Sequence, residues 1–210
     1  MQDPPYPAER SALYSAIERI QPLTVDAKAA IDPLLRRRTA EAATLLLRAG
    51  RPSTHVLFLY QGLMREYYSD SEGTETTRRF CAEGDFSGSL ADMLTGGPAA
   101  VSIEAMDRCI IVEAEWNRFD ALSECHPSIM KLQRRFAEIL YIRKMRREFE
   151  MLTLSAVERL REFVRENPKL DARLPKHVVA SYLGITPVHL SRIRAALKRQ
   201  QSQATRKGRK

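Results

Sequence analysis

Residues 174–199 read LPKHVVASYLGITPVHLSRIRAALKR and predict two short helices joined by a tight turn. Apolar residues recur at helical spacing in both helices: Val178, Val179, Tyr182 and Leu183 in the first, and Leu190, Ile193 and Leu197 in the second. Gly184 stands where the first helix must end in a left-handed conformation. Thr186 and Pro187 suit the cap and the first position of the second helix.

This spacing is that of a helix-turn-helix, in which the second helix enters the DNA major groove and the first crosses the backbone. The outer face of the second helix offers hydrogen-bond donors and no carboxylate. An ordinary helical hairpin inside a larger domain shares the apolar spacing but is seldom left so basic. We therefore expect DNA contacts from Lys176, Thr186, Val188, His189, Ser191, Arg192 and Arg199.

Charge is distributed unevenly along the 210 residues. Residues 155–210 hold 14 Lys and Arg against 4 Asp and Glu, whereas residues 1–154 hold 20 against 22. A near-neutral body with a basic end indicates a sensing part attached to a part that meets a polyanion. A solvated basic tail would explain the final TRKGRK but not the charge around the turn.

Several classes of protein are disfavoured by composition. No run of 18 apolar residues and no secretory leader is present, so we expect a cytoplasmic protein with no membrane partner. Cys81, Cys109 and Cys125 are widely spaced and support neither a disulfide framework nor a metal site. We expect no cofactor and no metal, and whether a cysteine senses redox state stays open.

The first third of the chain predicts helices and then strands. Helical spacing runs from Glu9 to a stop at Pro22, and again over residues 25–35. The run Arg36-Arg37-Arg38 that follows is a phosphate-binding patch or a solvated face, of which we favour the second. Alternating short segments separated by turns then predict a small β-roll or jelly roll with strands at residues 44–47, 56–60, 64–69, 74–80, 101–105 and 109–113.

A short helix over residues 116–122 leads to an uninterrupted helix over residues 128–151. The apolar stripe of this long helix is broad enough to cover the β-roll on one side and a second copy of itself on the other. We expect Phe136 and Ile139 in the contact between copies. Ser155 and Glu158 then form a capping box for a helix with Val157, Leu160 and Val164 inside.

This order of parts resembles the bacterial transcription regulators that include the cyclic-AMP receptor protein and the oxygen regulator FNR. The matching segments are 59–63 (LYQGL), 83–86 (EGDF), 97–105 (GPAAVSIEA) and 184–193 (GITPVHLSRI). The resemblance implies an α+β fold with a cyclic-nucleotide-binding-like β-roll over residues 1–127, a dimerisation helix over 128–154 and a helix-turn-helix domain over 155–210. It also implies a homodimer on an inverted-repeat operator, RNA polymerase as a further partner and a small-molecule effector.

The expected effector segment departs from the family. Members that bind cyclic AMP carry a Glu for the ribose and an Arg for the phosphate, and here Ser89 and Ala99 stand at those positions. A buried phosphate without its cation is poorly compensated. The segment around Gly88, Ser89, Ala99 and Ala100 is therefore degenerate, and we expect a signal other than cyclic AMP. No cysteine precedes Cys81, which disfavours an iron–sulfur sensor.

The reading helix also departs from the family. Val188 replaces a Glu that accepts from cytosine, so direct readout should rest on Arg192, with Val188 near a thymine methyl and His189 and Ser191 on phosphate. We expect a minimal or absent wing, because few residues separate the helices and the tail SQATRKGRK lacks strand formers. The tail itself would contact phosphates.

Two rival interpretations stay open. A β-roll enzyme would need two or three His with a carboxylate on one metal, whereas His55 stands alone in the β-region and no catalytic constellation is apparent, so we expect no enzyme. A constitutive or architectural DNA-binding dimer without an effector would share the DNA surface. Saturable binding of a small molecule would separate this alternative from a regulator.

Overall fold

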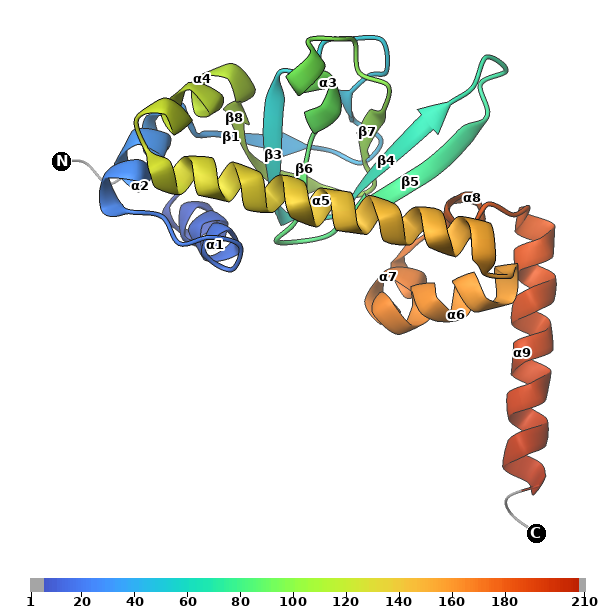
Figure 1. Cartoon of the computed structure of the whole chain (residues 1–210). Coiled ribbons are helices and arrows are strands. Elements are labelled where there is room, and N and C mark those ends of the chain that lie inside the picture. The colour runs from blue at the N-terminus through green and yellow to red at the C-terminus, as the bar shows by residue number, and fades with distance from the viewer. Residues whose placement is uncertain (1–5, 208–210) are drawn as a thin grey trace. The chain divides into compact units, whose positions relative to one another are not determined.

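The computed structural model describes residues 6–207, of which residues 201–207 are described by their backbone alone (Figure 1). The chain forms two compact units. The first comprises the chain up to Thr74 together with Arg78–Arg143, and the second comprises Glu75–Thr77 together with the chain from Lys144 onward. The domain limits that we infer from the sequence stay a proposal.

Helices and short 3₁₀ turns flank the strands of the first unit. Those before the strands are α1 (Pro7–Glu18), α2 (Val25–Ile31) and η1 (Asp32–Leu34), and those after them are α4 (Trp116–Ala121) and η2 (Leu122–Glu124). The long helix α5 (Pro127–Thr153) follows. These elements confirm the helices predicted from apolar spacing.

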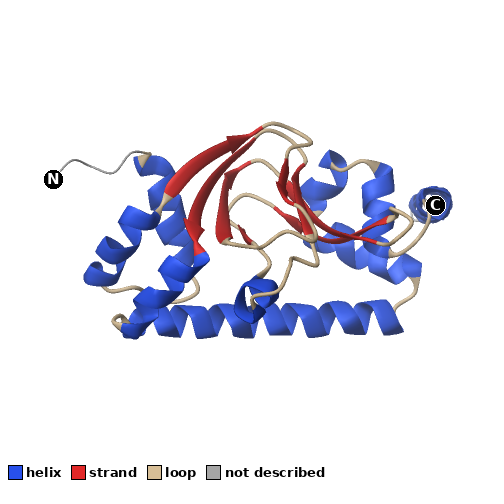
Figure 2. Ribbon diagram, turned by 90° about the horizontal axis from the view of Figure 1, so that it is seen from above, coloured by secondary structure: helices blue, strands red, loops and turns tan. Residues whose placement is uncertain are grey.

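Two antiparallel sheets form a roll, and Figure 2 shows the strands curving around a common interior. The order in the first sheet is β1 (Arg36–Ala40), β8 (Cys109–Glu115), β3 (His55–Gln61), β6 (Phe86–Ser87). The order in the second is β2 (Leu45–Leu47), β7 (Ser102–Ala105), β4 (Met64–Ser69), β5 (Glu75–Cys81). The six strands predicted from alternation are all present, within one or two residues of their predicted ends.

Successive side chains of a strand point to opposite faces of the sheet. In the first sheet apolar side chains point to both faces, so each face packs in a core. Leu57 and Leu59 pack in a core between the two sheets. Phe58, from the same strand, packs in a different core together with Leu13 of α1 and Ile129 of α5. The helices therefore cover the outer face of this sheet, while its inner face closes the roll.

Three elements of the first unit differ from the prediction. The arginine run is not a helix end but strand β1, in which Arg38 is paired with Ile111 of β8. Arg36 and Arg37 are exposed, as expected of a solvated face, and Arg37 also forms an ion pair with Glu9 at 2.9 Å. Strand β6 and helix α3 (Leu90–Thr95) were not predicted, because both are too short to show a period.

The second unit is helical apart from Glu75–Thr77 of β5. After the last part of α5 it contains α6 (Ala156–Glu166), α7 (Pro168–Arg173), α8 (Lys176–Leu183) and α9 (Pro187–Lys207). The predicted capping box is present: the Ser155 hydroxyl accepts from the Glu158 N–H at 3.3 Å, and the Glu158 carboxylate accepts from the Ser155 N–H at 2.8 Å. Val164, predicted inside, is 38% exposed, and Phe163 is buried in its place.

The turn between α8 and α9 has the predicted geometry. Gly184 adopts φ +67°, and the Thr186 hydroxyl accepts from the His189 N–H at 3.2 Å. Leu183 and Leu190 on either side of the turn are fully buried. Helix α7 occupies the segment in which a short linker was expected, and no strand follows α6 within the described residues. The side chains of the basic tail lie outside the described part of the chain.

Candidate functional site

The segment between β6 and β7 holds the four residues of the predicted effector segment. Gly88 adopts φ +137°, and a Cβ at this position would lie 3.1 Å from the carbonyl oxygen of His55, so a larger residue would be strained. Ser89 and Ala99 are buried, with exposed fractions of 6% and 2%. Ser89 and Ala100 lie close together, because both donate to the carboxylate of Asp92.

The carboxylate of Asp92 accepts hydrogen bonds from two donors of this segment. It accepts from the backbone N–H of Ala100 at 3.0 Å and from the hydroxyl of Ser89. Residues 87–100 contain no Lys or Arg. An incoming phosphate would therefore meet a carboxylate and no cation from this segment, which is electrostatically unfavourable.

An ionic cluster centred on the buried Glu66 lies beside β6. The carboxylate of Glu66, whose residue is 1% exposed, accepts from the Ser87 hydroxyl at 2.8 Å. Arg78 and Arg79 form ion pairs with it at 3.3 and 3.5 Å. The Cys81 thiol is 3.4 Å away, and burial raises the pKa of this thiol far above its usual range.

In this cluster the carboxylate of Glu66 neutralises the charge of the neighbouring arginines. A buried carboxylate requires a paired cation, and Arg79 supplies it while also donating to the carbonyl oxygen of Phe86 at 3.0 Å. Neither Arg78 nor Arg79 is therefore a spare partner for a phosphate. The sequence analysis did not identify this cluster. The available signal was Glu66, a charged residue in a strand whose neighbouring residues are buried.

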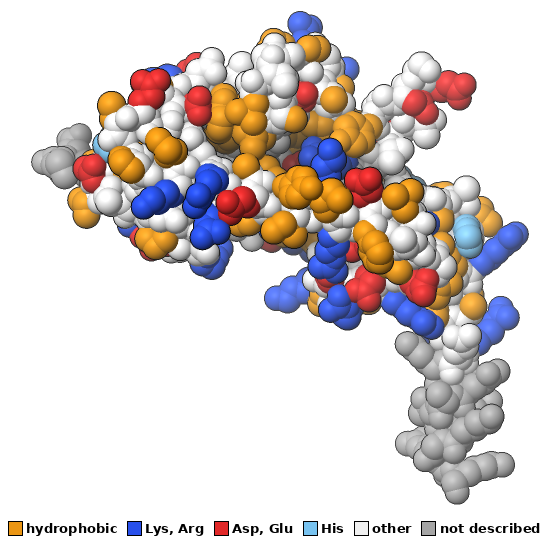
Figure 3. All heavy atoms as spheres, in the orientation of Figure 1, with side chains coloured by type: hydrophobic (Ala, Val, Ile, Leu, Met, Phe, Trp, Pro, Cys, Tyr) orange, Lys and Arg blue, Asp and Glu red, His pale blue; other side chains and the backbone are white. Residues whose placement is uncertain are grey.

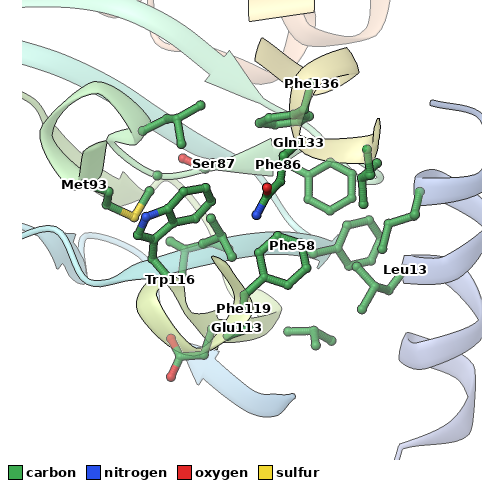
Figure 4. A pocket seen from close by; sticks show the side chains of 18 of the residues that line it. Leu13, Phe58, Phe86, Ser87, Met93, Glu113, Trp116, Phe119, Gln133 and Phe136 are labelled. Carbon is green, nitrogen blue, oxygen red and sulfur yellow. The ribbon is translucent and has the colours of Figure 1, made fainter. Parts of the chain in front are cut away.

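A cavity of about 110 Å³ is lined by β3, β6 and β8 of the first sheet, by Arg79 of β5 and by the helices α1 to α5 (Figure 4). Its aromatic lining consists of Phe58, Phe86, Trp116, Phe119 and Phe136. Gln133 reaches toward the centre, and its amide donates to Asp120 at 3.1 Å. The carboxylate of Glu113 points away from the rings and is paired with Arg38 at 3.6 Å. The cavity is thus almost entirely apolar.

Helix α5 carries apolar side chains on two opposite faces. Its inner face includes the fully buried Ile129 and the half-buried Phe136, whose ring meets that of Phe86 edge to face at 5.6 Å. Phe136 thus packs against its own chain, and the expectation that Phe136 and Ile139 lie between two copies stays a prediction. Exposed apolar side chains gather along the other face (Figure 3), where they are Met130, Tyr141, Ile142, Met145, Phe149 and Leu152.

The predicted nucleic-acid contacts all lie on the surface of α8, α9 and the turn between them. Lys176, Thr186, Val188, His189, Ser191, Arg192 and Arg199 are exposed. The hydroxyls of Thr186 and Ser191 are used locally, the first as the cap of α9 and the second as a donor to the Pro187 carbonyl at 3.0 Å. Arg194 is engaged by Asp171, whereas Arg192 has no partner within the described residues.

Two arginines that sequence reasoning missed support the C-terminal end of α8. Arg159 Nε donates to the carbonyl oxygen of Leu183 at 3.1 Å, and Arg147 donates to that of Tyr182. The Arg147 guanidinium also lies 4.0 Å from the centre of the Tyr182 ring. Both carbonyls are at a helix end and lack intrahelical donors. These arginines are positioning residues for the turn that leads into α9.

Other site chemistries were considered over the same residues. Cys81 and Cys109 are buried and Cys125 is exposed. Within residues 6–207, no three His, Cys, Asp or Glu side chains converge in a way that would hold a metal ion. No helix in that range has the length and hydropathy needed to cross a bilayer.

Part of the first unit matches a known family model. Residues 37–126 match the family model described as the cyclic nucleotide-binding domain. This stretch of the first unit is therefore similar to that domain. The matched residues run from β1 to the end of η2, so they include both the Asp92 segment and the Glu66 cluster. No curated protein matches the chain by sequence.

Solved structures resemble almost the whole chain. The c-di-GMP-responsive global regulator CLP of Xanthomonas campestris aligns with a TM-score of 0.68 at 15% identity, covering 86% of this chain and 93% of that one. FixK2 of Bradyrhizobium japonicum aligns with a TM-score of 0.67 at 18% identity, covering 80% and 86%. A regulator of the CRP/FNR family from Eubacterium rectale gives 0.63 at 16% identity, with 85% of each chain covered. At these identities the likeness concerns the fold.

Proposed function

We propose that this protein is a dimeric, sequence-specific DNA-binding transcription regulator of the CRP/FNR type. The observation that carries the proposal is the pair α8 and α9, joined at Gly184, with Arg192 exposed and without a partner among the described residues. The fold likeness to regulators of this type supports it. RNA polymerase would be the further partner of such a regulator.

In this proposal α9 enters the major groove as the helix of a helix-turn-helix. The guanidinium of Arg192 is suited to a guanine edge, and the 62% exposed Val188 to a thymine methyl. His189 and Lys176 would contact phosphates, as would Arg199. The hydroxyls of Thr186 and Ser191 already have partners in α9, so we assign them a smaller part in the contact.

The outer face of α5 would form the contact between two copies. Ile142, Met145, Phe149 and Leu152 recur at spacings of three and four residues, as a two-helix seam requires, and their exposed fractions run from 45% to 78%. Apolar side chains exposed in such a row usually mark an association surface. A twofold axis would present two copies of α9 to an inverted repeat.

The ligand of the β-roll would differ from cyclic AMP. The Asp92 carboxylate holds the donors of the effector segment, and Glu66 neutralises the nearest buried arginine. The second candidate is a constitutive DNA-binding dimer. The carboxylates of Asp92 and Glu66 also favour it, because a domain whose donors and cations are already paired internally needs no effector. Saturable binding of a small molecule that changes DNA affinity would exclude this candidate.

Selection from a random DNA pool, using the full chain, tests the proposed function. We expect enrichment of an inverted repeat whose half-sites lie roughly 34 Å apart, and an affinity that falls steeply with salt. Equal affinity for all sequences would favour the architectural dimer. Failure to bind any DNA at low salt would contradict the proposal.

A further inference from the structure

Two adjoining cavities lie along the inner face of α5 in the first unit. One is the aromatic cavity of about 110 Å³ described above. The other, of about 170 Å³, is bounded by α1, by the turn at Gly84 and by α5. Ile20, Phe86 and Phe136 line both. The edge-to-face pair of Phe86 and Phe136 therefore stands between them, and a ligand that reaches from one to the other must pass these rings.

The first cavity fits an apolar group about the size of one ring. Its volume of about 110 Å³ is below the roughly 150 Å³ of an apolar cavity that holds benzene, so one ring is the largest group it could take. Rings pack favourably edge to face against other rings, and Phe58 and Phe119 are placed for this on the wall of the cavity (Figure 4). The polar side chains of its wall are already engaged, since Arg79 pairs with Glu66 and Glu113 with Arg38.

The second cavity carries positive charge. Arg19, directly after α1, and Arg143 of α5 line it, both are exposed, and neither has a partner within the described part of the chain. A Cβ at Gly84 would lie 3.6 Å from Nη2 of Arg19, so this guanidinium lies beside the turn. The carboxylate on this wall is that of Asp85, which accepts from the Ala82 N–H at 3.1 Å and is paired with Arg79 at 3.7 Å.

We propose that these cavities bind a small monocarboxylic acid whose apolar body is about one ring in size. The body would occupy the aromatic cavity, and the carboxylate would accept hydrogen bonds from Arg19 and Arg143. Guanidinium groups bind carboxylates well because their planar donors match the two oxygens. The role of this acid as an effector rests on the proposed function, whereas its binding does not.

Isothermal titration calorimetry on the full chain, without DNA, tests the site. The probe is 3-phenylpropanoate, compared with the uncharged 3-phenylpropanamide and with propanoate, which lacks the ring. For a ligand of this size we expect a dissociation constant of about 0.1–1 mM, with both comparison compounds about tenfold weaker or worse.

Substitutions separate a built site from nonspecific binding. Arg19→Gln and Arg143→Gln should each weaken the acid about tenfold and leave the amide unchanged. Arg134→Gln is the matched control, because it removes an exposed guanidinium of the same helix that lines neither cavity, and it should change nothing. Circular dichroism confirms that each variant is folded.

Three results would overturn the inference: no saturable binding of the acid up to about 10 mM, equal binding of acid and amide, or no effect of either arginine variant. The outcome is independent of DNA. A protein that binds the acid but no DNA would contradict the proposed function and support the site, whereas a protein that selects an operator but not the acid would do the reverse.

Discussion

The carboxylate of Asp92 accepts a hydrogen bond from the backbone N–H of Ala100, 3.0 Å away, and another from the Ser89 hydroxyl. The segment between β6 and β7 therefore already holds an anion of its own. A cyclic nucleotide would have to displace this carboxylate and would find no cation in residues 87–100 to replace it. The β-roll is thus present, while a carboxylate of the chain itself holds these two donors.

We therefore expect that neither cyclic AMP nor cyclic GMP binds. Calorimetry on the full chain should show no saturable heat at millimolar nucleotide. The Asp92→Asn variant should behave in the same way, because removal of the carboxylate does not supply a cation. A micromolar or tighter dissociation constant for either nucleotide would mean that Arg78 or Arg79 leaves Glu66 for the phosphate.

Charged substitutions test whether the protein dimerises through the outer face of α5. Met145→Glu combined with Phe149→Glu places carboxylates in an exposed apolar row, so sedimentation should show monomers where the wild type is dimeric at micromolar concentration. Phe136→Leu is the control and should remain dimeric, because Phe136 contacts Phe86 of its own chain. A monomeric wild type, or a dimeric double variant, would rule out this interface.

The capping box of α6 makes the stability of the second unit depend on pH. Hydrogen bonds from the Ser155 side chain and backbone lower the pKa of Glu158 below its usual 4.5. Because the folded pKa is the lower one, the stabilisation is fully present above about pH 4.5 and is lost as pH falls through the folded value. Ser155→Ala should reduce the free energy of unfolding by about 1 kcal/mol at neutral pH.

Thermal unfolding followed by circular dichroism between pH 7 and pH 3 measures this effect. The Glu158→Gln variant has no carboxylate to protonate, so its loss of stability below pH 4.5 should be shallower than that of the wild type. Identical slopes in the two proteins would mean that the capping box does not contribute.

Local patterns predicted most of the fold. Strands such as β3 alternate strongly, and the turn at Gly184 has no plausible conformation other than a left-handed one. Strand β1 was missed because three consecutive arginines conceal a period of two. This segment is a strand because it pairs with β8, which lies about 70 residues away in the sequence. A local sequence pattern cannot show such a distant partner.

The site was predictable only in part. Ser89 and Ala99 were located through the motif around them, but the role of Asp92 depends on helix α3, which is too short to predict. The pair of Glu66 and Arg79 depends on the register of β4 and β5 within the roll. Arg159 escaped notice because its acceptor is a backbone carbonyl, which has no sequence signature.

Lys176, at the start of α8, should act on DNA through phosphate alone. Its side chain is exposed, and it lies on a different helix from the α9 residues that would read bases. Lys176→Ala should therefore weaken binding about equally for all sequences and reduce the slope of affinity against salt by about one unit. Titrations at several salt concentrations measure both quantities. A selective loss on the operator alone would instead assign Lys176 to base recognition.

The ratio of operator to scrambled-DNA affinity in the Arg192→Ala variant tests the central claim most directly. Arg192 is exposed on α9, opposite the buried Leu190 and Ile193, and has no partner within the described residues. If it reads a base, the variant should lose about 1–3 kcal/mol on the selected operator and accept other bases at one position per half-site, while scrambled DNA is affected far less. An unchanged ratio would contradict the account and would favour a DNA-binding dimer that does not read sequence through α9.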